Sequence, residues 1–261
     1  MDLGIRGKTA LVLGASSGLG RAMALALARE GCNVAIGARR EDALTAVAGE
    51  ITDAGAKALP LIWDLADLDS IEAHVSTVER ALGGIDILVN NTGGPPPTKA
   101  EGQDADVWLR NFQTMVLSII KLTDRVLPGM RDRRWGRVLT STSAGVVTPI
   151  PNLALSNALR SSLVGWSKTL SREVAADGVT VNVIIPGRIS TDRIGQLDRN
   201  RAEREGLSVE QVQADSLKSI PMGRLGDPEE YGAVAAFLCS ARASYVTGTM
   251  VRVDGGQIPN V

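Results

Sequence analysis

Three glycines within seven residues, at positions 14, 18 and 20, form the clearest chemical signal of this sequence. They lie between an apolar run that predicts a strand, Thr9–Leu13, and a pattern that predicts a helix, Gly20–Glu30. Glycine allows a tight turn, a close approach of the backbone to a pyrophosphate, and close packing of the helix on the strand. The free N–H groups at the start of the helix, together with its dipole, attract phosphate. We therefore expect a nucleotide at this turn, and a packing turn without a ligand is the alternative. The residues expected to line the nucleotide are Gly14, Ser16, Ser17, Gly18, Leu19 and Gly20.

Two arginines follow the second expected strand, Asn33–Ile36. A cofactor with a free ribose 2′-hydroxyl calls for an acidic residue in this place, but here Arg39 and Arg40 follow a glycine and an alanine. A guanidinium suits a 2′-phosphate because it forms bidentate, charge-assisted hydrogen bonds. We therefore expect NADP(H) in preference to NAD(H). The alternative is that both arginines pair with Glu41 and Asp42 at the surface.

Short apolar runs alternate with longer helical patterns along the whole chain, and these elements must position the nucleotide. Because the runs are continuously apolar, they predict parallel strands that are covered on both faces. We expect a single Rossmann-like, doubly wound parallel α/β sheet of about seven strands, with helices on both faces. The expected strands are Thr9–Leu13, Asn33–Ile36, Ala58–Ile62, Ile85–Val89, Arg137–Thr140, Val179–Ile185 and Met250–Val253. The expected helices are Gly20–Glu30, Glu41–Ala54, Asp69–Leu82, Asp106–Leu127, Leu153–Ala176 and Pro228–Ser240.

The domain organisation follows from this alternation. No linker, repeat or low-complexity tract divides the chain, so residues 1–261 are expected to form one domain. The stretch from about 188 to 227 is too long for a tight connection and predicts a partly helical flap. Asp64 and Leu65 close the third strand, where they could reach the adenine of the cofactor.

Composition narrows the class of protein further. The net charge of −1 indicates neither a nucleic-acid partner nor a polybasic membrane surface. The first residues lack an apolar signal segment and no run approaches the length of a membrane span, so we expect a soluble cytoplasmic protein. Cys32 and Cys239 form no CxxC pattern and are expected to be reduced. No catalytic metal is expected, and the only histidine, His74, is expected to pack or lie at the surface.

Several further motifs, in order along the chain, resemble those of the short-chain dehydrogenase/reductase family, closest to its acyl-carrier-protein reductase-like members. The glycine-rich turn is similar to TGxxxGxG, with Leu13 in place of the threonine, and residues 90–93, NNTG, are similar to NNAG. Residues 186–191 resemble the family's PG…T segment, and residues 245–256 its C-terminal motifs. The resemblance implies an NAD(P)-dependent oxidoreductase. It adds Asn91, Thr92, Gly93, Pro186, Gly187, Ile189 and Thr191 to the expected cofactor site.

The catalytic residues of that family are mostly replaced. Family enzymes use a serine, a tyrosine thirteen residues later, a lysine four further on, and an asparagine on the preceding long helix. The resemblance places Ser143 at the serine position, Ser156 at the tyrosine, Arg160 at the lysine and Met115 at the asparagine. Only the serine is kept, and no shift of register helps, because the two tyrosines of the chain lie far downstream. Met115 is expected to pack in the core.

The replacements keep groups that can bind a cofactor but remove the usual proton donor. Ser156 is a far weaker acid than a phenol, and a guanidinium stays protonated, so Arg160 can donate hydrogen bonds but cannot relay a proton. Ser156 and Arg160 are four apart on a helix, so both can point at the cleft, where Arg160 can also contact the cofactor.

Three interpretations remain open. The first is a carbonyl reductase or alcohol dehydrogenase in which Ser143 polarises the carbonyl, Arg160 stabilises the oxyanion, and water or substrate supplies the proton. The second is a catalytically inactive NADP-binding sensor or partner protein. The third is a non-redox lyase or isomerase in the same cleft. In the flap, Arg188 and Arg193 are the arginines expected to meet an anionic substrate or the cofactor. The resemblance also implies a homo-oligomer, a dimer or tetramer, formed through the long helices 106–127 and 153–176.

Overall fold

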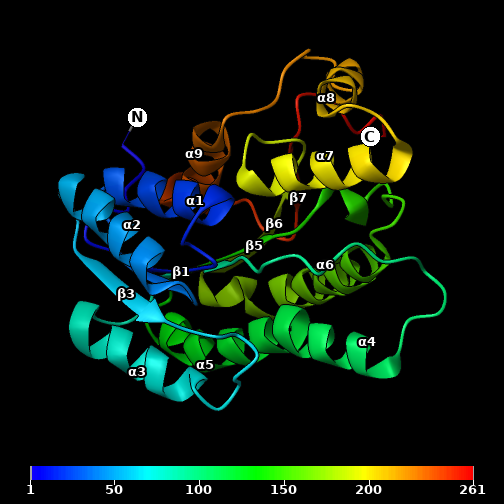
Figure 1. Ribbon diagram of the computed structural model, residues 1–261. Coiled ribbons are helices and arrows are strands. Elements are labelled where there is room, and N and C mark those ends of the chain that lie inside the picture. Colours follow the sequence, from blue (N-terminus) through cyan, green and yellow to red (C-terminus); the bar gives the residue numbers. More distant parts are fainter. Residues whose placement is uncertain (1, 261) are drawn as a thin grey trace.

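The computed structural model describes residues 2–260 and contains one sheet of seven parallel strands (Figure 1). The strand order is β3-β2-β1-β4-β5-β6-β7, with every neighbouring pair parallel. Two halves of the sheet therefore wind outward from β1 and β4, which confirms the predicted doubly wound fold. The strands are β1 Thr9–Leu13, β2 Asn33–Ala38, β3 Ala58–Ile62, β4 Ile87–Asn90, β5 Gly136–Ser141, β6 Val179–Pro186 and β7 Met250–Val253. All lie within two residues of their predicted bounds.

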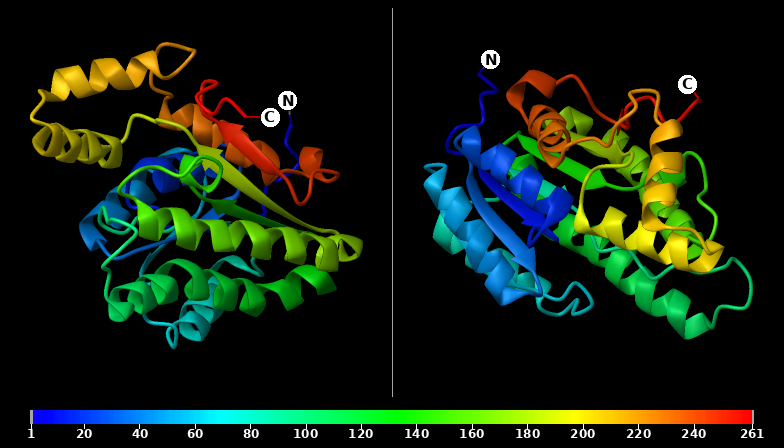
Figure 2. Two further views of the ribbon diagram at one scale, coloured as in Figure 1. Left: turned by 90° about the vertical axis from the view of Figure 1, so that its right-hand side faces the viewer. Right: turned by 45° about the horizontal axis from the view of Figure 1, so that its top comes forward.

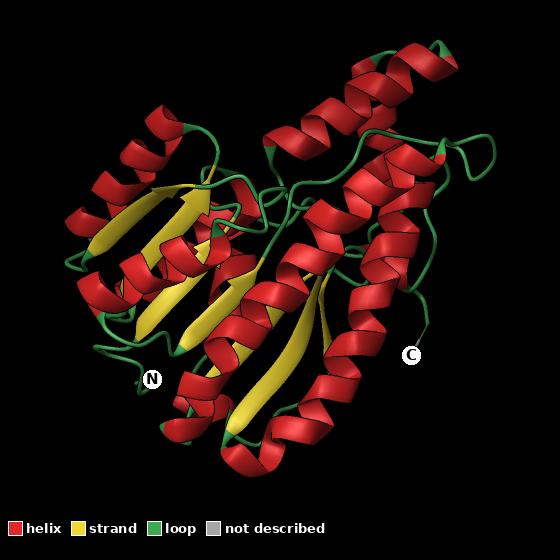
Figure 3. Cartoon of the chain, turned by 90° about the horizontal axis from the view of Figure 1, so that it is seen from below, coloured by secondary structure: helices red, strands yellow, loops and turns green. Residues whose placement is uncertain are grey.

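Helices cover both faces of the sheet (Figures 1 and 3). On one face lie α1 Gly18–Arg29, α2 Glu41–Asp53 and α9 Pro228–Leu238, which share a hydrophobic cluster with β1 and β2. On the other lie α3 Ile71–Leu82, α5 Ser118–Asp132 and α6 Ala154–Val174, which form a second cluster against the sheet. Strands buried on both faces explain why their sequences are continuously apolar. Within the described residues, 2–260, no helix is long and apolar enough to cross a bilayer.

The helix predicted at 106–127 is interrupted and ends later than expected. The chain forms α4, Ala105–Phe112, then a π-helical turn, Gln113–Leu117, and then α5, which continues through Pro128 to Asp132. A π turn holds one extra residue per turn, which a sequence period of 3.6 does not reveal. Met115 lies inside this turn and is buried in the core, as predicted.

The stretch between β6 and β7 contains two helices that stand above the carboxyl ends of the strands (Figure 2). These are α7, Asp192–Glu205, and α8, Val209–Lys218. The Thr191 hydroxyl caps α7 by accepting a hydrogen bond from the N–H of Ile194, and Ser208 and Gln211 form a capping box at α8. Local capping therefore favours helix at the start of both α7 and α8. Short 3₁₀ turns lie at Ala144–Val146, Ala175–Asp177 and Ala241–Ala243.

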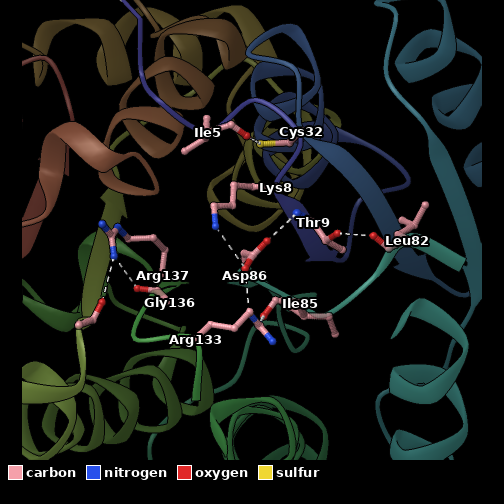
Figure 4. Close-up of polar contacts among 11 residues, drawn as sticks. Ile5, Lys8, Thr9, Cys32, Leu82, Ile85, Asp86, Arg133, Gly136 and Arg137 are labelled. Atoms are coloured by element: carbon pink, nitrogen blue, oxygen red, sulfur yellow. Dashed lines mark hydrogen bonds and ion pairs between the residues drawn. The ribbon is translucent and has the colours of Figure 1, made fainter. Parts of the chain in front are cut away.

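The amino ends of the central strands are held together by paired charges (Figure 4). Asp86, just before β4, is buried and accepts a hydrogen bond of 3.1 Å from the backbone N–H of Thr9. Its carboxylate also pairs with Arg133 at 3.1 Å and Lys8 at 3.7 Å. Nearby, Arg137 is buried, donates to the Ser240 carbonyl at 2.9 Å, and lies over the Trp135 ring. These hydrogen bonds and ion pairs hold together the amino ends of β1, β4 and β5.

Candidate active site

The glycine-rich turn has the geometry that its sequence predicts. Gly14 and Gly18 adopt φ angles of 59° and 53°, which side chains with a Cβ rarely adopt. A Cβ added at Gly20 would lie 2.1 Å from the Gly14 carbonyl oxygen, so only glycine fits where α1 meets the end of β1. The N-cap residue of α1, Ser17, makes no side-chain capping bond, and no acid lies in the first turn. The N–H groups at this end of α1 are thus left for an anion, and they fit a pyrophosphate.

Arg40 lies against this turn. Its Nη2 donates to the hydroxyls of Ser16 at 3.3 Å and Ser17 at 3.0 Å. Arg39 and Arg40 are both exposed, and within residues 2–260 neither forms an ion pair with Glu41 or Asp42. The surface pairing considered as the alternative is therefore not the arrangement in this structure. The hydroxyls of Ser16 and Ser17 and the Arg40 guanidinium therefore lie together beside the turn, where they could bind a ribose phosphate.

The segment after β4 joins the turn to the centre of the sheet. The Asn91 side chain donates to the carbonyls of Leu13 at 3.2 Å and Gly14 at 3.3 Å, which fixes the glycine turn against β4. Thr92 and Gly93 offer their carbonyl oxygens on the other side, toward α6. Asp64 is exposed and accepts a bond from the N–H of Ala66, beside the half-buried Leu65.

The start of the flap lies beside the same turn. At the end of β6, the Gly187 N–H donates to the Val253 carbonyl at 2.9 Å, and a Cβ on Gly187 would lie 2.5 Å from the Cα of Asp254. Gly187 directly follows Pro186, the last residue of β6, so the end of β6 lies close against the chain at Asp254. Ile189 is buried and pairs with Gly226 in an isolated bridge. The Thr191 methyl group would lie 3.5 Å from a Cβ on Gly18, so the flap begins against the glycine turn.

Arg160 lies buried at the carboxyl ends of β4 and β5, with only 7% of its surface exposed. Its guanidinium donates to three carbonyl oxygens, those of Thr92 at 3.1 Å, Gly93 at 3.4 Å and Ser141 at 3.3 Å. Among the described residues no carboxylate pairs with it. Burial lowers the pKa of Arg160 to about 10, with a smaller opposing effect of Tyr231 and a further lowering by Arg193. The group is thus a cation at neutral pH, next to a second arginine.

The sequence did not predict that Tyr231 touches the floor of this site. Its hydroxyl on α9 lies 2.9 Å from the Ser141 hydroxyl and donates to the Ile184 carbonyl at 3.3 Å. Tyr231 is fully buried, and burial raises its pKa, so the phenol is a poor proton donor. It holds Ser141, whose carbonyl accepts from Arg160. A hydroxyl on an otherwise apolar helix face was the available signal, but only the fold brings position 231 to β5.

Ser143 and Ser156 lie at the same edge but make few contacts. The Ser143 hydroxyl accepts from the N–H of Gly145 at 3.1 Å and is half-buried. Ser156 is buried in the first turn of α6, one helical turn before Arg160. Within residues 2–260, no hydrogen bond links Ser143 to Ser156 or to Arg160. The structure thus brings the three residues to one edge of the sheet without a direct relay between them.

The two flap arginines differ in what they contact. Arg188 forms an ion pair with the buried Asp198 of α7, so its charge is already balanced. Arg193 instead donates to the Pro95 carbonyl at 2.9 Å. Of the two arginines expected to meet an anion, only Arg193 is without an acidic partner in the described part of the chain.

Three of the buried polar atoms that lack a hydrogen-bond partner within residues 2–260 lie near this site, while others, such as Trp63 Nε1 and Thr180 Oγ1, lie elsewhere. The buried hydroxyls of Thr92 and Thr142 and the Nε of Arg188 have no hydrogen-bond partner among the described residues. Buried polar groups in native proteins are nearly always paired, so such atoms mark places where a ligand or water completes the bonding. The remaining polar candidates are elsewhere. His74 stacks on Trp63 with ring centroids 4.4 Å apart, a packing role as expected. Both cysteines are free and buried, and residues 2–260 hold no group of three or more His, Cys, Asp or Glu placed for a metal.

A doubly wound sheet with a glycine turn at the first strand defines an α/β nucleotide-binding protein. Comparisons with known proteins identify the family. A family model described as enoyl-(acyl carrier protein) reductase matches residues 14–257. The 3-oxoacyl-[acyl-carrier-protein] reductase FabG of Vibrio harveyi is 36% identical over 256 residues, which span 97% of this chain and 98% of that protein. The chain belongs to the short-chain dehydrogenase/reductase family and is similar to its 3-oxoacyl-[acyl-carrier-protein] reductases.

Solved structures agree with this assignment. L-sorbose reductase from Gluconobacter frateurii, complexed with NADPH and L-sorbose, superposes with a TM-score of 0.94 over 100% of both chains, at 32% identity. NAD⁺-bound xylitol dehydrogenase superposes with a TM-score of 0.91 over 97% of this chain and 99% of that one, at 26% identity. Similar folds therefore accept either dinucleotide, and the choice between them depends on the residues that follow β2.

Proposed function

We propose that this chain is an NADP(H)-dependent oxidoreductase that interconverts a carbonyl and an alcohol without a tyrosine acid. The observation that carries the proposal is the buried guanidinium of Arg160, which takes the lysine position of the family and lies where the carboxyl ends of β4 and β5 meet. The family and the NADPH-bound neighbour support the redox chemistry. The proton route without a tyrosine is inferred from the residues of this chain, Ser143, Ser156 and Arg160.

Each retained residue has a defined part in this chemistry. When bound, NADPH would supply the hydride that forms the new C–H bond at the carbonyl carbon, and the electron pair of the C=O bond would pass to the oxygen. The Ser143 hydroxyl donates a hydrogen bond to that oxygen, and the Arg160 cation stabilises its negative charge. Since neither an aliphatic hydroxyl nor a guanidinium gives up a proton readily, the proton comes from water or from the substrate.

The experiment that tests this proposal compares two arginines on one helix. Arg160→Ala should reduce carbonyl reduction at least ~100-fold, in the range measured when an oxyanion donor is removed. Arg172→Ala, on the exposed side of α6, should keep the wild-type rate. A panel of aldehydes and ketones is followed by NADPH consumption and product analysis. Undiminished turnover by Arg160→Ala would rule out this proton route.

The cofactor preference depends on Arg39 and Arg40. We expect NADPH to bind more tightly than NADH because the Arg40 guanidinium already lies on the hydroxyls of Ser16 and Ser17. Titration of the protein with each nucleotide, followed by fluorescence and calorimetry, measures the preference. Equal affinity for the two nucleotides would mean that the arginines do not contact a 2′-phosphate.

A second candidate function is a catalytically inactive NADP-binding sensor or partner protein. Two observations favour it. Arg160 already donates hydrogen bonds to three carbonyl oxygens, and Tyr231 is fully buried, so its phenol cannot reach a substrate. It predicts NADPH binding with no oxidation of NADPH by any carbonyl of the panel. A triple variant, Met115→Asn with Ser156→Tyr and Arg160→Lys, would then gain activity that the natural chain lacks. Product formed without a change in cofactor absorbance would instead indicate a non-redox reaction.

The outer surface of α4 and α6 fits the proposed homo-oligomer. Leu109 is 64% and Phe112 40% exposed, and the neighbouring face of α6 presents small residues. A largely apolar groove of about 390 Å³ lies near this surface, where Trp108 of α4 and Ala158 of α6 line it together with the loop at residues 145–149. Light scattering coupled to gel filtration tests this proposal, and a monomer at micromolar concentration would contradict it. The two free cysteines fit the proposed cytoplasmic location.

A further inference from the structure

We propose that the substrate of this site carries a carboxylate, which binds between Arg160 on α6 and Arg193 on α7. This inference names the substrate class of the proposed oxidoreductase. It therefore rests on the proposed function, which places the substrate site beside Arg160. It concerns binding, so it can be tested even if no hydride transfer occurs.

Both arginines donate hydrogen bonds to one short segment of chain, residues 92–95. Arg160, on α6, donates to the carbonyls of Thr92 and Gly93, and Arg193, on α7 of the flap, donates to the carbonyl of Pro95. A Cβ added at Gly94, between these contacts, would lie 3.1 Å from Nη2 of Arg193. Residues 92–95 therefore bring two guanidinium groups toward the same part of the cleft.

The positive charge of this pair is not balanced within the protein. Neither arginine has an ion-pair partner in residues 2–260, and the nearby acid on the flap, Asp198, is already paired with Arg188. The two cations repel each other, and desolvation lowers the pKa of both Arg160 and Arg193. Buried charges are normally paired, and Arg160 is a buried charge without an acid among the described residues, to which the exposed Arg193 adds a second positive charge, so the pair favours an anionic ligand.

Burial of an arginine alone would not justify this conclusion, as Arg137 shows. Arg137 is equally buried and also donates to carbonyl oxygens, but the Trp135 ring lies 4.4 Å from its guanidinium carbon and offers a negative π face. Within residues 2–260 no aromatic ring forms a cation–π contact with Arg160, and a second arginine, Arg193, adds to the positive charge around it. The difference lies in this uncompensated pair and in its position at the carboxyl ends of the strands, where ligands bind in such sheets.

A carboxylate is the anion that this arrangement suits. A planar guanidinium donates two parallel hydrogen bonds to a carboxylate, and such bonds are strong because both partners are charged. Arg160 uses three donors on carbonyl oxygens and Arg193 uses one, so donors remain on both groups. An oxo acid would place its carboxylate on these donors and its carbonyl at the same edge as Ser143.

The test compares each oxo acid with its own methyl ester, because the pair differs in charge and hardly in shape. Calorimetry measures the binding of 2-oxobutanoate, 3-oxobutanoate and 4-oxopentanoate, and of their methyl esters, to the protein with and without saturating NADP⁺. We expect at least one acid to bind at least ~10-fold more tightly than its ester. Arg193→Gln should remove most of that preference while ester affinity stays the same. Arg199→Gln should leave the preference intact, because Arg199 is exposed like Arg193 but contacts Gln196 on its own helix and not residues 92–95.

The outcomes separate this inference from the proposed function. Preference for an acid, lost in Arg193→Gln, supports a carboxylate site even when no member of the panel is reduced, in which case only the proposed redox function fails. Reduction of the esters as efficiently as the acids would keep the redox function and overturn the carboxylate site. Equal affinity of acid and ester for all three pairs, or no binding of any acid, also overturns it.

Discussion

At the amino ends of the strands Asp86 is buried among an arginine, a lysine and a backbone N–H (Figure 4). At the carboxyl ends Arg160 is buried, and no acid within residues 2–260 pairs with it. Each edge also has an arginine that donates to backbone carbonyls, but Arg137 has an aromatic partner and Arg160 has Arg193. A buried arginine therefore finds a favourable partner for its charge within the described part of the protein at the amino edge, but not at the carboxyl edge.

This difference separates stability from function in one sheet. Charges that are paired in the folded chain contribute to stability and need no ligand. Unpaired charges and unbonded hydroxyls, such as that of Thr92, cost stability until a ligand binds. Substitutions at the amino edge should therefore change unfolding, while substitutions at the carboxyl edge should change binding and turnover.

The largest effect is expected for Gly20→Ala, which breaks the carboxyl edge at its nucleotide turn. The added Cβ would lie 2.1 Å from a backbone oxygen, so the turn must move and NADPH affinity should fall more than ~100-fold, with a stability loss of about 3 kcal/mol. Calorimetric titration and urea unfolding measure the two effects. Gly49→Ala is the control, because an alanine there meets open space in α2 and should stabilise the helix by about 1 kcal/mol. NADPH affinity unchanged by Gly20→Ala would contradict the account of the turn.

Asp86→Ala should do the reverse and lower stability without affecting the ligand site. The loss leaves Arg133 and Lys8 without their acid, and since both reach solvent we expect about 2–3 kcal/mol, below the value for a fully buried pair. Urea unfolding gives the stability, and NADPH titration of the folded protein should give the wild-type affinity. The exposed Asp132 supplies the control, Asp132→Ala, with little effect on either. A weaker NADPH affinity in folded Asp86→Ala would show that the two edges are not independent.

Arg40→Ala tests the outer part of the carboxyl edge. Loss of a guanidinium that contacts a 2′-phosphate should weaken NADPH roughly 10- to 100-fold and leave NADH affinity unchanged. Arg29→Ala, at the opposite end of α1, serves as the control and should change neither affinity. A parallel loss of NADPH and NADH affinity would show that Arg40 supports the turn and does not read the phosphate.

The smallest effect on stability is expected for substitution of His74, which lies at neither edge of the sheet. It serves as a reference for the pH dependence of unfolding. Burial against Trp63 lowers the pKa of His74 below its ordinary value of 6.5, so the unfolded chain binds the proton more readily. The stability that the neutral His74 ring contributes is therefore fully present above about pH 6.5 and should be lost as the pH falls below that value. We expect the loss to be less than ~1 kcal/mol, because the ring is only half-buried. His74→Phe keeps the stacking and should show a smaller loss between pH 7.5 and pH 5.5 in urea unfolding. Identical pH dependence in the two proteins would contradict the assignment.

The sequence predicted the fold because its signals are local. Apolar runs gave the strands to within two residues, and the glycine spacing placed the turn between β1 and α1. The π turn at Gln113–Leu117 was missed because its hydrogen-bond shift leaves no period in the sequence.

The contacts of the site could be predicted only in part, because they join residues distant along the chain. Spacing brought Ser156 and Arg160 to one helix face, but it could not show that Tyr231 meets Ser141 or that Arg193 reaches Pro95. Nor could it show that Arg188 is neutralised by Asp198. Such contacts depend on how α7 and α9 pack against the sheet, which no local pattern encodes.

The most direct test of the account is a single-turnover experiment with the protein saturated with NADPH. The bound cofactor is mixed rapidly with a carbonyl from the panel, and the absorbance of the reduced nicotinamide is followed alongside product formation. The account predicts that the wild-type protein oxidises its bound NADPH with at least one carbonyl, and that Arg160→Ala binds NADPH but fails to oxidise it. Oxidation at the wild-type rate by Arg160→Ala, or no oxidation by the wild-type protein with any carbonyl, would contradict it.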